Sequence, residues 1–462
     1  MATEILVFIP GTLGSELWDG ANKVWPGSTW EAIKGFNDTR FQQLLKPGLT
    51  PRDIVRSAAG GFIGIYSKWI EAFEAISRGG QQLFRENPPA GKTKTLYVFP
   101  YDWRVDLTAT ATLLADLLES ILAKTADADI KLVCHSMGGV LARYYLESGS
   151  FNARSAFSHI SLLVTLGTPH NGATAAFAAA TGLDKTTFLS LEQTKTLAND
   201  TRYLSVYQLF PVKTHSFIWS LDSGSAYKDF PADDPAIVKK YGLTSAGLTA
   251  WTTFRAALTG TRPGHVRYFF IVGSRQETLV RLLWDGGTLQ RVELEDAGDG
   301  TVSLSGAMDA TTQSEFVGKS HVSLIETRPA RQTLAALFGA ETLFAAAELV
   351  QQVTLAVRDL AVTTDDEIHV QIEFVPPVDR FKGELKFERA VVPDAGESAG
   401  PLTFAEIPAL NSMPVELIGT AFTYVTVKAD PLELTGIYRP VLTQEGKASK
   451  TIGPAFAVQP AD

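Results

Sequence analysis

The sequence predicts an α/β protein, in which a mostly parallel sheet carries helices on both faces, followed by a smaller all-β domain. Two observations lead to this prediction. Short, almost entirely apolar runs alternate with segments of helical periodicity through the first three quarters of the chain, a pattern that favours strands covered on both faces. After about residue 340, apolar and polar residues alternate between turn residues, which is typical of an antiparallel β-sandwich.

The elements of the larger domain are predicted in the following order. The apolar runs that predict parallel strands are residues 4–9, 96–99, 130–134, 160–164 and 266–272. Apolar residues at helical spacing predict helices at 107–124, 138–146 and 328–338. Residues 278–294 are typical of a hairpin, because Asp285, Gly286 and Gly287 form a turn signal between two strand patterns.

Two long stretches, residues 16–94 and 172–264, do not fit this alternation. Each is much longer than an ordinary strand-to-helix connection, so each is predicted to be a cap or lid insertion. The first contains Trp18, Trp25 and Trp30 and the apolar run 58–66. Two interpretations remain open for these residues: they contact an apolar ligand or a membrane, or they pack the core of the cap.

The all-β region is predicted to be a separate domain. Its strand patterns are residues 353–362, 367–375, 383–392, 422–429 and 432–438. We therefore expect domains at 1–345 and 346–462. A chain of roughly 110 residues can form its own core, so the second domain is predicted to be an accessory that recruits a protein partner, a membrane or another copy of the chain. Its removal should then spare chemistry on small substrates.

Composition excludes several classes of protein. The 462 residues carry 41 Lys and Arg against 50 Asp and Glu, a formal charge of −9, which argues against a nucleic-acid binder. Cys134 is the only cysteine, so an intrachain disulfide and a cysteine-rich zinc site are excluded. We expect no cofactor and no metal. No apolar run predicts a signal peptide or a membrane-spanning helix, so we expect a cytoplasmic protein.

The motif that indicates chemistry is Cys134–Gly138, with the sequence CHSMG. It lies where the third predicted strand ends and a helix begins, which is the context of a nucleophile elbow. In this turn the backbone pushes the serine hydroxyl above the sheet, and the residues two positions away must be small. Gly138 meets this requirement, and Cys134 replaces the usual first glycine. Ser136 is therefore the predicted nucleophile.

A serine nucleophile needs a base, and His321 is the best candidate. It follows a strand pattern at 315–318 and precedes the last predicted helix, which agrees with the chain order Ser, then Asp or Glu, then His. His170 could line the site, but it precedes every late carboxylate. The remaining candidates in this domain are predicted to be core or surface residues: His159, His215 and His265.

The carboxylate that orients the base is predicted in the loop 296–302. Asp299, 22 residues before His321, is flanked by glycines that allow a tight turn, and Asp296 is the alternative. The developing oxyanion needs two backbone N–H donors. One is expected from Met137, the residue after the nucleophile, and the other from the loop 10–14 after the first strand.

Several separated motifs together resemble the family of lecithin:cholesterol acyltransferase and lysosomal phospholipase A2, within the α/β-hydrolase superfamily. The most specific is PYDWR at 100–104, and the others are FIPGTLGS at 8–15, HSMG at 135–138, LGTPHNG at 166–172, GDGTV at 298–302 and SH at 320–321. The resemblance implies the α/β-hydrolase fold, with Ser136 as nucleophile, Asp299 as acid and His321 as base, and with Thr12 and Met137 as oxyanion donors. Asp102 and Arg104 are expected to form a bracing ion pair. The lid disulfide of the family cannot form here.

From these residues we expect a serine esterase or lipase that hydrolyses lipid carboxylic esters, phospholipids among them, through an acyl-enzyme on Ser136. Two alternatives remain open. The acyl group is passed to an alcohol, as in an acyltransferase, or the chain is a catalytically weak binding or assembly protein that uses its carboxy-terminal domain. The expected partners are a lipid or other ester substrate, a membrane surface contacted peripherally, and a protein or second copy bound through that domain.

Overall fold

The computed structural model describes residues 2–59, 63–221, 227–258, 261–309, 311–340, 352–391, 403–407, 412–447 and 449–461. The chain divides into two compact units. The first comprises Met1–Pro26, Thr39–Val55 and Tyr66–Thr342, and the second comprises Gly27–Asp38, Arg56–Ile65 and Leu343–Asp462.

The core of the first unit is a parallel sheet, which confirms the predicted fold class. Among the described residues the sheet has six strands in the order β17-β14-β11-β10-β1-β9, and every neighbouring pair is parallel. The strands are β1 (Thr3–Ile9), β9 (Leu96–Val98), β10 (Ala128–His135), β11 (Ile160–Leu166), β14 (Arg267–Gly273) and β17 (Ser314–Val317). The strand order reverses between β1 and β10, and ligands of such sheets bind beyond the carboxyl ends of the strands at this switch point.

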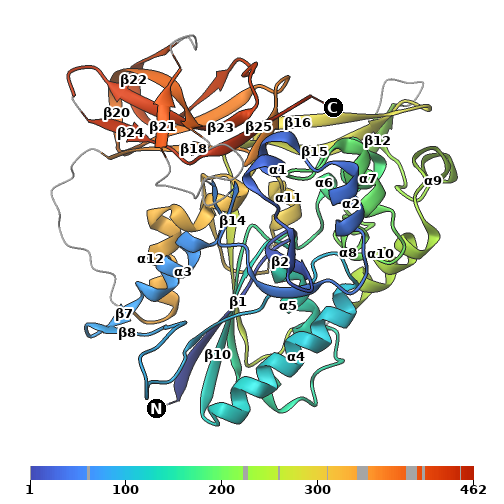
Figure 1. The fold of residues 1–462 in the computed structure, drawn as a ribbon. Helices are drawn as coiled ribbons and strands as arrows, with labels where there is room; N and C mark the ends of the chain where they lie inside the picture. Colours follow the sequence, from blue (N-terminus) through green and yellow to red (C-terminus); the bar gives the residue numbers. More distant parts are fainter. Residues whose placement is uncertain are drawn as a thin grey trace. The chain divides into compact units, whose positions relative to one another are not determined.

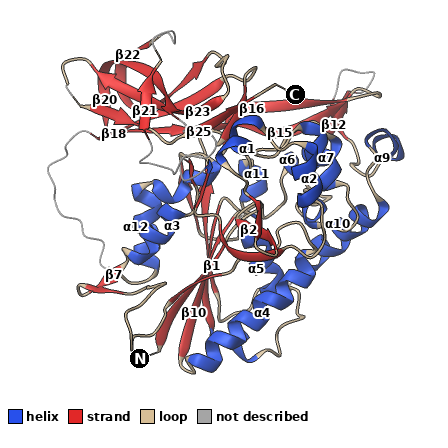
Figure 2. Ribbon diagram, in the orientation of Figure 1, coloured by secondary structure: helices blue, strands red, loops and turns tan. Residues whose placement is uncertain are grey.

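The predicted helices also form, and they cover both faces of the sheet. In Figure 2, α3 and α12 lie on one side of the central strands and α4 and α5 on the other. The helical elements next to the sheet are α3 (Ser67–Glu74), α4 (Leu107–Lys124), α5 (Met137–Glu147), η2 (Ser155–His159), α11 (Leu304–Ala307), η3 (His321–Glu326) and α12 (Arg328–Leu337). Asp106 begins α4 by accepting a hydrogen bond from the Thr108 N–H at 2.8 Å, and so pairs a donor that the helix leaves free.

The two predicted insertions contain small substructures (Figure 1). The first holds β2 (Ser15–Asp19), β3 (Asn22–Trp25), α1 (Thr29–Lys34), α2 (Asp38–Leu44), β4 (Thr50–Ile54), β5 (Ser57–Ala58), β6 (Ile63–Gly64), α3, β7 (Ser77–Arg78) and β8 (Gln81–Gln82). The second holds α6 (Thr174–Thr181), α7 (Leu191–Ala198), α8 (Ser205–Gln208), β12 (Ile218–Leu221), β13 (Tyr227–Asp229), α9 (Pro235–Tyr241) and α10 (Ser245–Ala257).

The predicted hairpin is confirmed as β15 (Gln276–Trp284) and β16 (Leu289–Gly298), which pair antiparallel. β12 of the second insertion pairs in parallel with β15, so the hairpin and the insertion share a four-stranded sheet within the described residues. An apolar cluster that includes Phe177, Trp251 and Trp284 packs this part of the chain. The second insertion and the hairpin therefore share one apolar core, and the role of the insertion as a cap stays a prediction.

The tryptophan-rich part of the first insertion has mixed surroundings. Trp25 is only 2% exposed, and its ring packs edge-on against Trp103 with centroids 5.4 Å apart, which favours the core-packing interpretation at this residue. Trp30 is 41% exposed. Of the apolar run 58–66, residues 60–62 lie outside the described part of the chain. Contact of Trp30 with acyl chains or a membrane stays a prediction.

The PYDWR motif braces the first unit, and the ion pair expected between Asp102 and Arg104 is present. Arg104 is 1% exposed and meets Asp102 through two bonds, Nε–Oδ1 at 2.8 Å and Nη2–Oδ2 at 2.6 Å. Its Nη1 donates to the carbonyls of Leu44 and Lys46 and to the Tyr203 hydroxyl. One guanidinium thus joins the end of β9 to α2 and to the segment before α8.

Replacing Arg104 with methionine is expected to destabilise the protein by about 3–5 kcal/mol, because the partly buried Asp102 carboxylate and two carbonyls lose their partner. Urea unfolding of the full chain measures this loss. Arg202→Met is the matched control, since Arg202 forms a similar forked pair with Asp200 at an exposed position. An Arg104→Met protein as stable as the Arg202→Met protein would contradict the bracing role.

The second unit is built around a largely antiparallel sheet, in which the described strands include one parallel pair, β19 with β25. Its strands are β18 (Gln352–Val357), β19 (Ala361–Thr363), β20 (Ile368–Val391), β21 (Thr403–Glu406), β22 (Met413–Ala429), β23 (Gly436–Gln444), β24 (Lys450–Ile452) and β25 (Phe456–Gln459). The strands predicted at 367–375 and 383–392 are one long strand, β20, whose register with β22 shifts between Glu373 and Arg380. Pro376 and Pro377 produce an irregularity there rather than a break.

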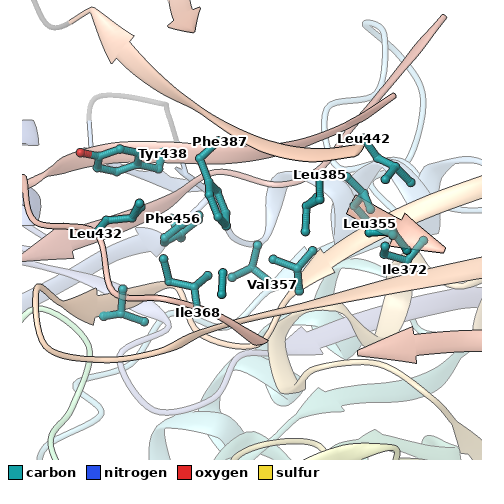
Figure 3. Close-up of a cluster of buried hydrophobic side chains, with 14 of the residues drawn as sticks. Leu355, Val357, Ile368, Ile372, Leu385, Phe387, Leu432, Tyr438, Leu442 and Phe456 are labelled. Carbon is teal, nitrogen blue, oxygen red and sulfur yellow. The ribbon is translucent and has the colours of Figure 1, made fainter. Parts of the chain in front are cut away.

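The apolar face of these strands forms a core within the second unit. Figure 3 shows side chains of β18, β20, β23 and β25 gathered between the strands. The fully buried members include Ile368, Leu385 and Phe456, each 0% exposed. The prediction that this region can bury its own apolar surface is therefore confirmed for the described strands.

The second unit also includes two segments from the predicted first insertion, Gly27–Asp38 and Arg56–Ile65. Helix α1 packs on β25, and Gln459 Nε2 donates to the Ala32 carbonyl at 2.8 Å. The boundary at residue 345 lies outside the described residues and stays a prediction, as does the accessory role. A cut at 345 would remove the strand that supports α1, so the 1–345 fragment has to be tested for folding before its activity is interpreted.

Among the described residues, no helix is both long enough and apolar enough to cross a membrane.

Candidate active site

Ser136 lies in a strained turn between β10 and α5. Its backbone angles are φ 53° and ψ −125°, a combination that is costly for any residue with a Cβ. The turn also depends on small neighbours. A Cβ added at Gly138 would meet the Ile9 and Pro10 carbonyl oxygens at 2.5 Å, and one added at Gly11 would meet the Ser136 Cβ at 2.7 Å. The structure therefore has the geometry of a nucleophile elbow at the switch point of the sheet.

Cys134 is the departure from the usual elbow sequence, and the turn accommodates it. Its side chain is 0% exposed on β10, and burial raises the pKa of the thiol well above its usual value. The thiol is therefore protonated at neutral pH and is a small core group.

Asp299 and His321 meet directly. His321 Nδ1 lies 2.8 Å from Asp299 Oδ2, and the two residues are 9% and 1% exposed. The other carboxylate oxygen, Oδ1, accepts the Thr301 N–H at 3.0 Å and the Val302 N–H at 2.7 Å. Asp299 is thus oriented by its own turn. The alternative, Asp296, is an exposed residue of β16 with φ 57°.

The backbone of His321 is held on both sides. Its N–H donates to the Asp299 carbonyl at 2.9 Å, and its carbonyl accepts from His135 Nε2 at 3.0 Å. The rings of His135 and His321 have centroids 4.7 Å apart. His135 directly precedes Ser136, so the predicted nucleophile follows a residue that contacts the predicted base.

The end of β11 lies between the elbow and the acid–base pair. The Ser136 N–H donates to the Leu166 carbonyl at 2.9 Å, and the Thr168 hydroxyl donates to the Ser136 carbonyl at 2.9 Å. A Cβ added at Gly167, between them, would meet Asp299 Oδ2 at 3.0 Å and His321 Nδ1 at 3.1 Å. Gly167 has φ 61°. A glycine is therefore favoured here both by the left-handed backbone conformation and by the close approach of Asp299 and His321.

The two predicted oxyanion residues also adjoin each other. The Thr12 hydroxyl lies 3.4 Å from the Met137 sulfur. Within the described residues, neither the Thr12 nor the Met137 backbone N–H donates to another protein group. Their role as oxyanion donors stays a prediction. The loop that carries Thr12 turns at Leu13, which has φ 62° and whose carbonyl accepts from the Trp25 indole at 2.8 Å.

Three of the other histidines in the first unit have structural partners: His170, His159 and His265. His170 stacks on Phe270 with centroids 3.6 Å apart and contacts Thr165 and Arg143; its burial lowers its pKa well below the usual value. His159 and His265 bond to the carbonyls of Ala128 and Phe157. Burial also lowers the pKa of His215. His369 lies in β20 of the second unit.

Sequence reasoning missed the supporting roles of Tyr66 and His135. The apolar run 58–66 predicts contact with acyl chains or a membrane, or packing in the core of the cap, whereas the Tyr66 hydroxyl accepts the Gly11 N–H at 3.0 Å and lies 2.7 Å from His135 Nδ1. The position of His135 beside the serine was visible in the sequence. Nothing in the sequence connected Tyr66 to it, because the two are 69 residues apart.

The family model described as lecithin:cholesterol acyltransferase matches residues 87–241. Among solved structures, the lin2722 gene product of Listeria innocua matches with 10% identity and a TM-score of 0.31, over 74% of this chain and 96% of that one. A cutinase-like protein from Cryptococcus sp. matches with 13% identity and a TM-score of 0.21, over 56% and 90% of the two chains. No curated protein matches the chain.

The family match covers the PYDWR motif and the elbow. The parallel sheet, the elbow and the Asp299–His321 pair define an α/β hydrolase. Over residues 87–241 the chain is similar to lecithin:cholesterol acyltransferase, so the resemblance found in the motifs is confirmed. The chain therefore has the α/β-hydrolase fold and is similar to the lecithin:cholesterol acyltransferase family over about a third of its length.

Proposed function

We propose that the protein is a serine esterase or lipase that cleaves lipid carboxylic esters through an acyl-enzyme on Ser136. In the first half-reaction the Ser136 Oγ attacks the ester carbonyl carbon and His321 Nε2 takes the hydroxyl proton. The tetrahedral intermediate then collapses, and the departing alcohol takes that proton from His321. Water adds to the acyl-enzyme by the reverse route and releases the carboxylic acid.

The observation that carries this proposal is the 2.8 Å contact between Asp299 and His321 beside an elbow serine with φ 53°. Asp299 would fix the Nδ1–H tautomer of His321 and so leave Nε2 free to accept the serine proton. The N–H groups of Thr12 and Met137 would stabilise the oxyanion, because preorganised donors act on charge that develops in the transition state.

The substrate class is proposed from the family resemblance, which points to lipid esters and, among them, phospholipids. The family model that matches residues 87–241 is named after an acyltransferase. This name supports transfer of the acyl group to an alcohol as the second candidate reaction. Both reactions form the same acyl-enzyme and differ in the acceptor.

A fluorophosphonate probe and a lipid mixture together test the proposal. We expect the probe to label the wild-type chain on Ser136, and the lipid mixture to yield free fatty acids by mass spectrometry. Addition of a long-chain alcohol separates the candidates, since a transferase forms the new ester at the expense of the acid. A folded protein that neither reacts with the probe nor consumes any ester would leave the binding or assembly alternative.

A further inference from the structure

A chain of three buried hydrogen bonds links the loop after β1 to the backbone of His321. The Gly11 N–H lies 3.0 Å from the Tyr66 hydroxyl, the hydroxyl lies 2.7 Å from His135 Nδ1, and His135 Nε2 lies 3.0 Å from the His321 carbonyl. Tyr66 and His135 are each 3% exposed. We propose that Tyr66 and His135 are positioning residues that hold the base and the oxyanion loop in register with the nucleophile. This inference rests on the proposed function.

The direction of each bond follows from the chemistry of its ends. A backbone N–H only donates and a carbonyl only accepts, so the Tyr66 oxygen accepts from Gly11 and His135 Nε2 carries a proton. Burial, together with the neighbouring His321, holds the pKa of His135 well below its usual value. His135 is therefore neutral, and its Nδ1 accepts the Tyr66 proton. Burial likewise raises the pKa of Tyr66, which keeps that proton in place.

Every polar atom of the Tyr66 and His135 side chains forms a hydrogen bond in this arrangement. Only one placement of the protons satisfies all of these bonds. Loss of any member leaves a buried group without a partner, which is costly in a dry interior. The network joins segments distant in sequence: the oxyanion loop at Gly11, the residue before α3, the elbow, and η3. The proposed reaction requires these segments to keep fixed positions relative to one another.

Helix α3 adds a second attachment to the same place. The Trp69 ring lies against His135 with centroids 4.9 Å apart, and its Nε1 donates to the Val322 carbonyl at 3.2 Å. Lys68 pairs with Glu326 at 2.8 Å. Both acceptors belong to η3, which begins at His321. The segment Tyr66–Glu74 therefore supports the base, although it lies in a region predicted to be a cap.

The neutrality of His135 suits its place beside the base. In the proposed reaction His321 becomes an imidazolium, and a second cation with its ring 4.7 Å away would oppose that charge. A neutral histidine that donates to the His321 backbone gives support without this repulsion. Both nitrogens of His135 are bonded to protein groups, so His135 acts through His321.

The test compares two tyrosines in the same kind of site. Tyr207 is 1% exposed, its hydroxyl accepts the Thr244 N–H at 2.8 Å, and it donates to Asn199 Oδ1 at 2.6 Å. Tyr66→Phe and Tyr207→Phe therefore remove matched pairs of buried bonds. We expect similar losses of thermal stability, whereas kcat for a short p-nitrophenyl ester falls roughly 10- to 100-fold only in Tyr66→Phe, with KM within about twofold of wild type.

Variants of His135 test the second residue. His135→Gln can still donate to the His321 carbonyl and is expected to keep more activity than His135→Leu, which cannot. A readout without turnover uses the Ser136→Ala background, where the far-downfield proton of the His321–Asp299 bond is followed by NMR. We expect this resonance to shift or broaden on adding Tyr66→Phe and to stay unchanged on adding Tyr207→Phe.

The proposed function and the network can fail separately. The first is judged on labelling and hydrolysis by the wild type, and the second on the comparison of the two tyrosine variants. A folded Tyr66→Phe protein with wild-type kcat, or an unshifted His321 resonance in the Ser136→Ala background, would overturn the positioning role and leave Tyr66 as a core residue.

Discussion

Replacing Ser136 with alanine is expected to lower hydrolysis of a short p-nitrophenyl ester by roughly four or more orders of magnitude, since it removes the only group proposed to bond to the acyl carbon. The fold should be retained, because the Ser136 side chain makes no capping bond at the start of α5. Removing the Ser136 side-chain oxygen leaves the close backbone contacts of the elbow unchanged. Initial rates at saturating ester, with circular dichroism as the check on folding, measure the effect.

A matched control for this variant is Ser303→Ala. Ser303 is also buried and also stands at the start of a helical turn, but its hydroxyl accepts the Gly306 N–H at 3.1 Å. Its replacement should cost stability by about 1 kcal/mol and spare turnover. Retained hydrolysis in Ser136→Ala, after removal of contaminating esterase, would show that another group is the nucleophile.

Replacing Asp299 with asparagine is expected to lower kcat by about four orders of magnitude, because the amide favours the wrong tautomer of His321 and cannot stabilise the imidazolium. The carboxylate is held by the Thr301 and Val302 N–H groups, so an asparagine can keep its oxygen on these donors. Its amide nitrogen would then face His321 in place of Oδ2. The measurement is kcat across a pH series.

The control for this variant is Asp296→Asn, three residues earlier and exposed. It should change kcat little. If the effects of the two substitutions were reversed, the orienting carboxylate would be Asp296, and the His321–Asp299 contact would have only a structural role. Comparing the Asp299→Asn and Asp296→Asn variants therefore decides which of the two carboxylates orients His321.

Much of the fold could be predicted from local patterns. The apolar runs at 4–9 and 160–164 became β1 and β11, and the helical spacing at 107–124 became α4 with the same bounds. Such strands can be predicted from their own residues alone, because a strand buried on both faces is apolar at every position. The 135–138 motif likewise indicated a turn, since Gly138 is required by the Ile9 and Pro10 carbonyls.

Other features could not be read from local patterns. β20 continues through Pro376 and Pro377, although proline usually ends a strand. The segments 27–38 and 56–65 fall in the same compact unit as the carboxy-terminal strands. In both cases contacts with distant partners outweigh local preference: β20 is held by β18, β22 and β23, and α1 by β25.

The sequence by itself determined the parallel core, the elbow at Ser136 and a short choice of partners for it, because each depends on residues adjacent along the chain. Only the tertiary structure decided that the Asp299 carboxylate, rather than Asp296, meets His321, and that Tyr66 joins Gly11 to His135. These contacts span 22, 55 and 69 residues. A hydrogen bond depends on the distance and direction between two atoms in space, and spacing along the chain does not specify either one.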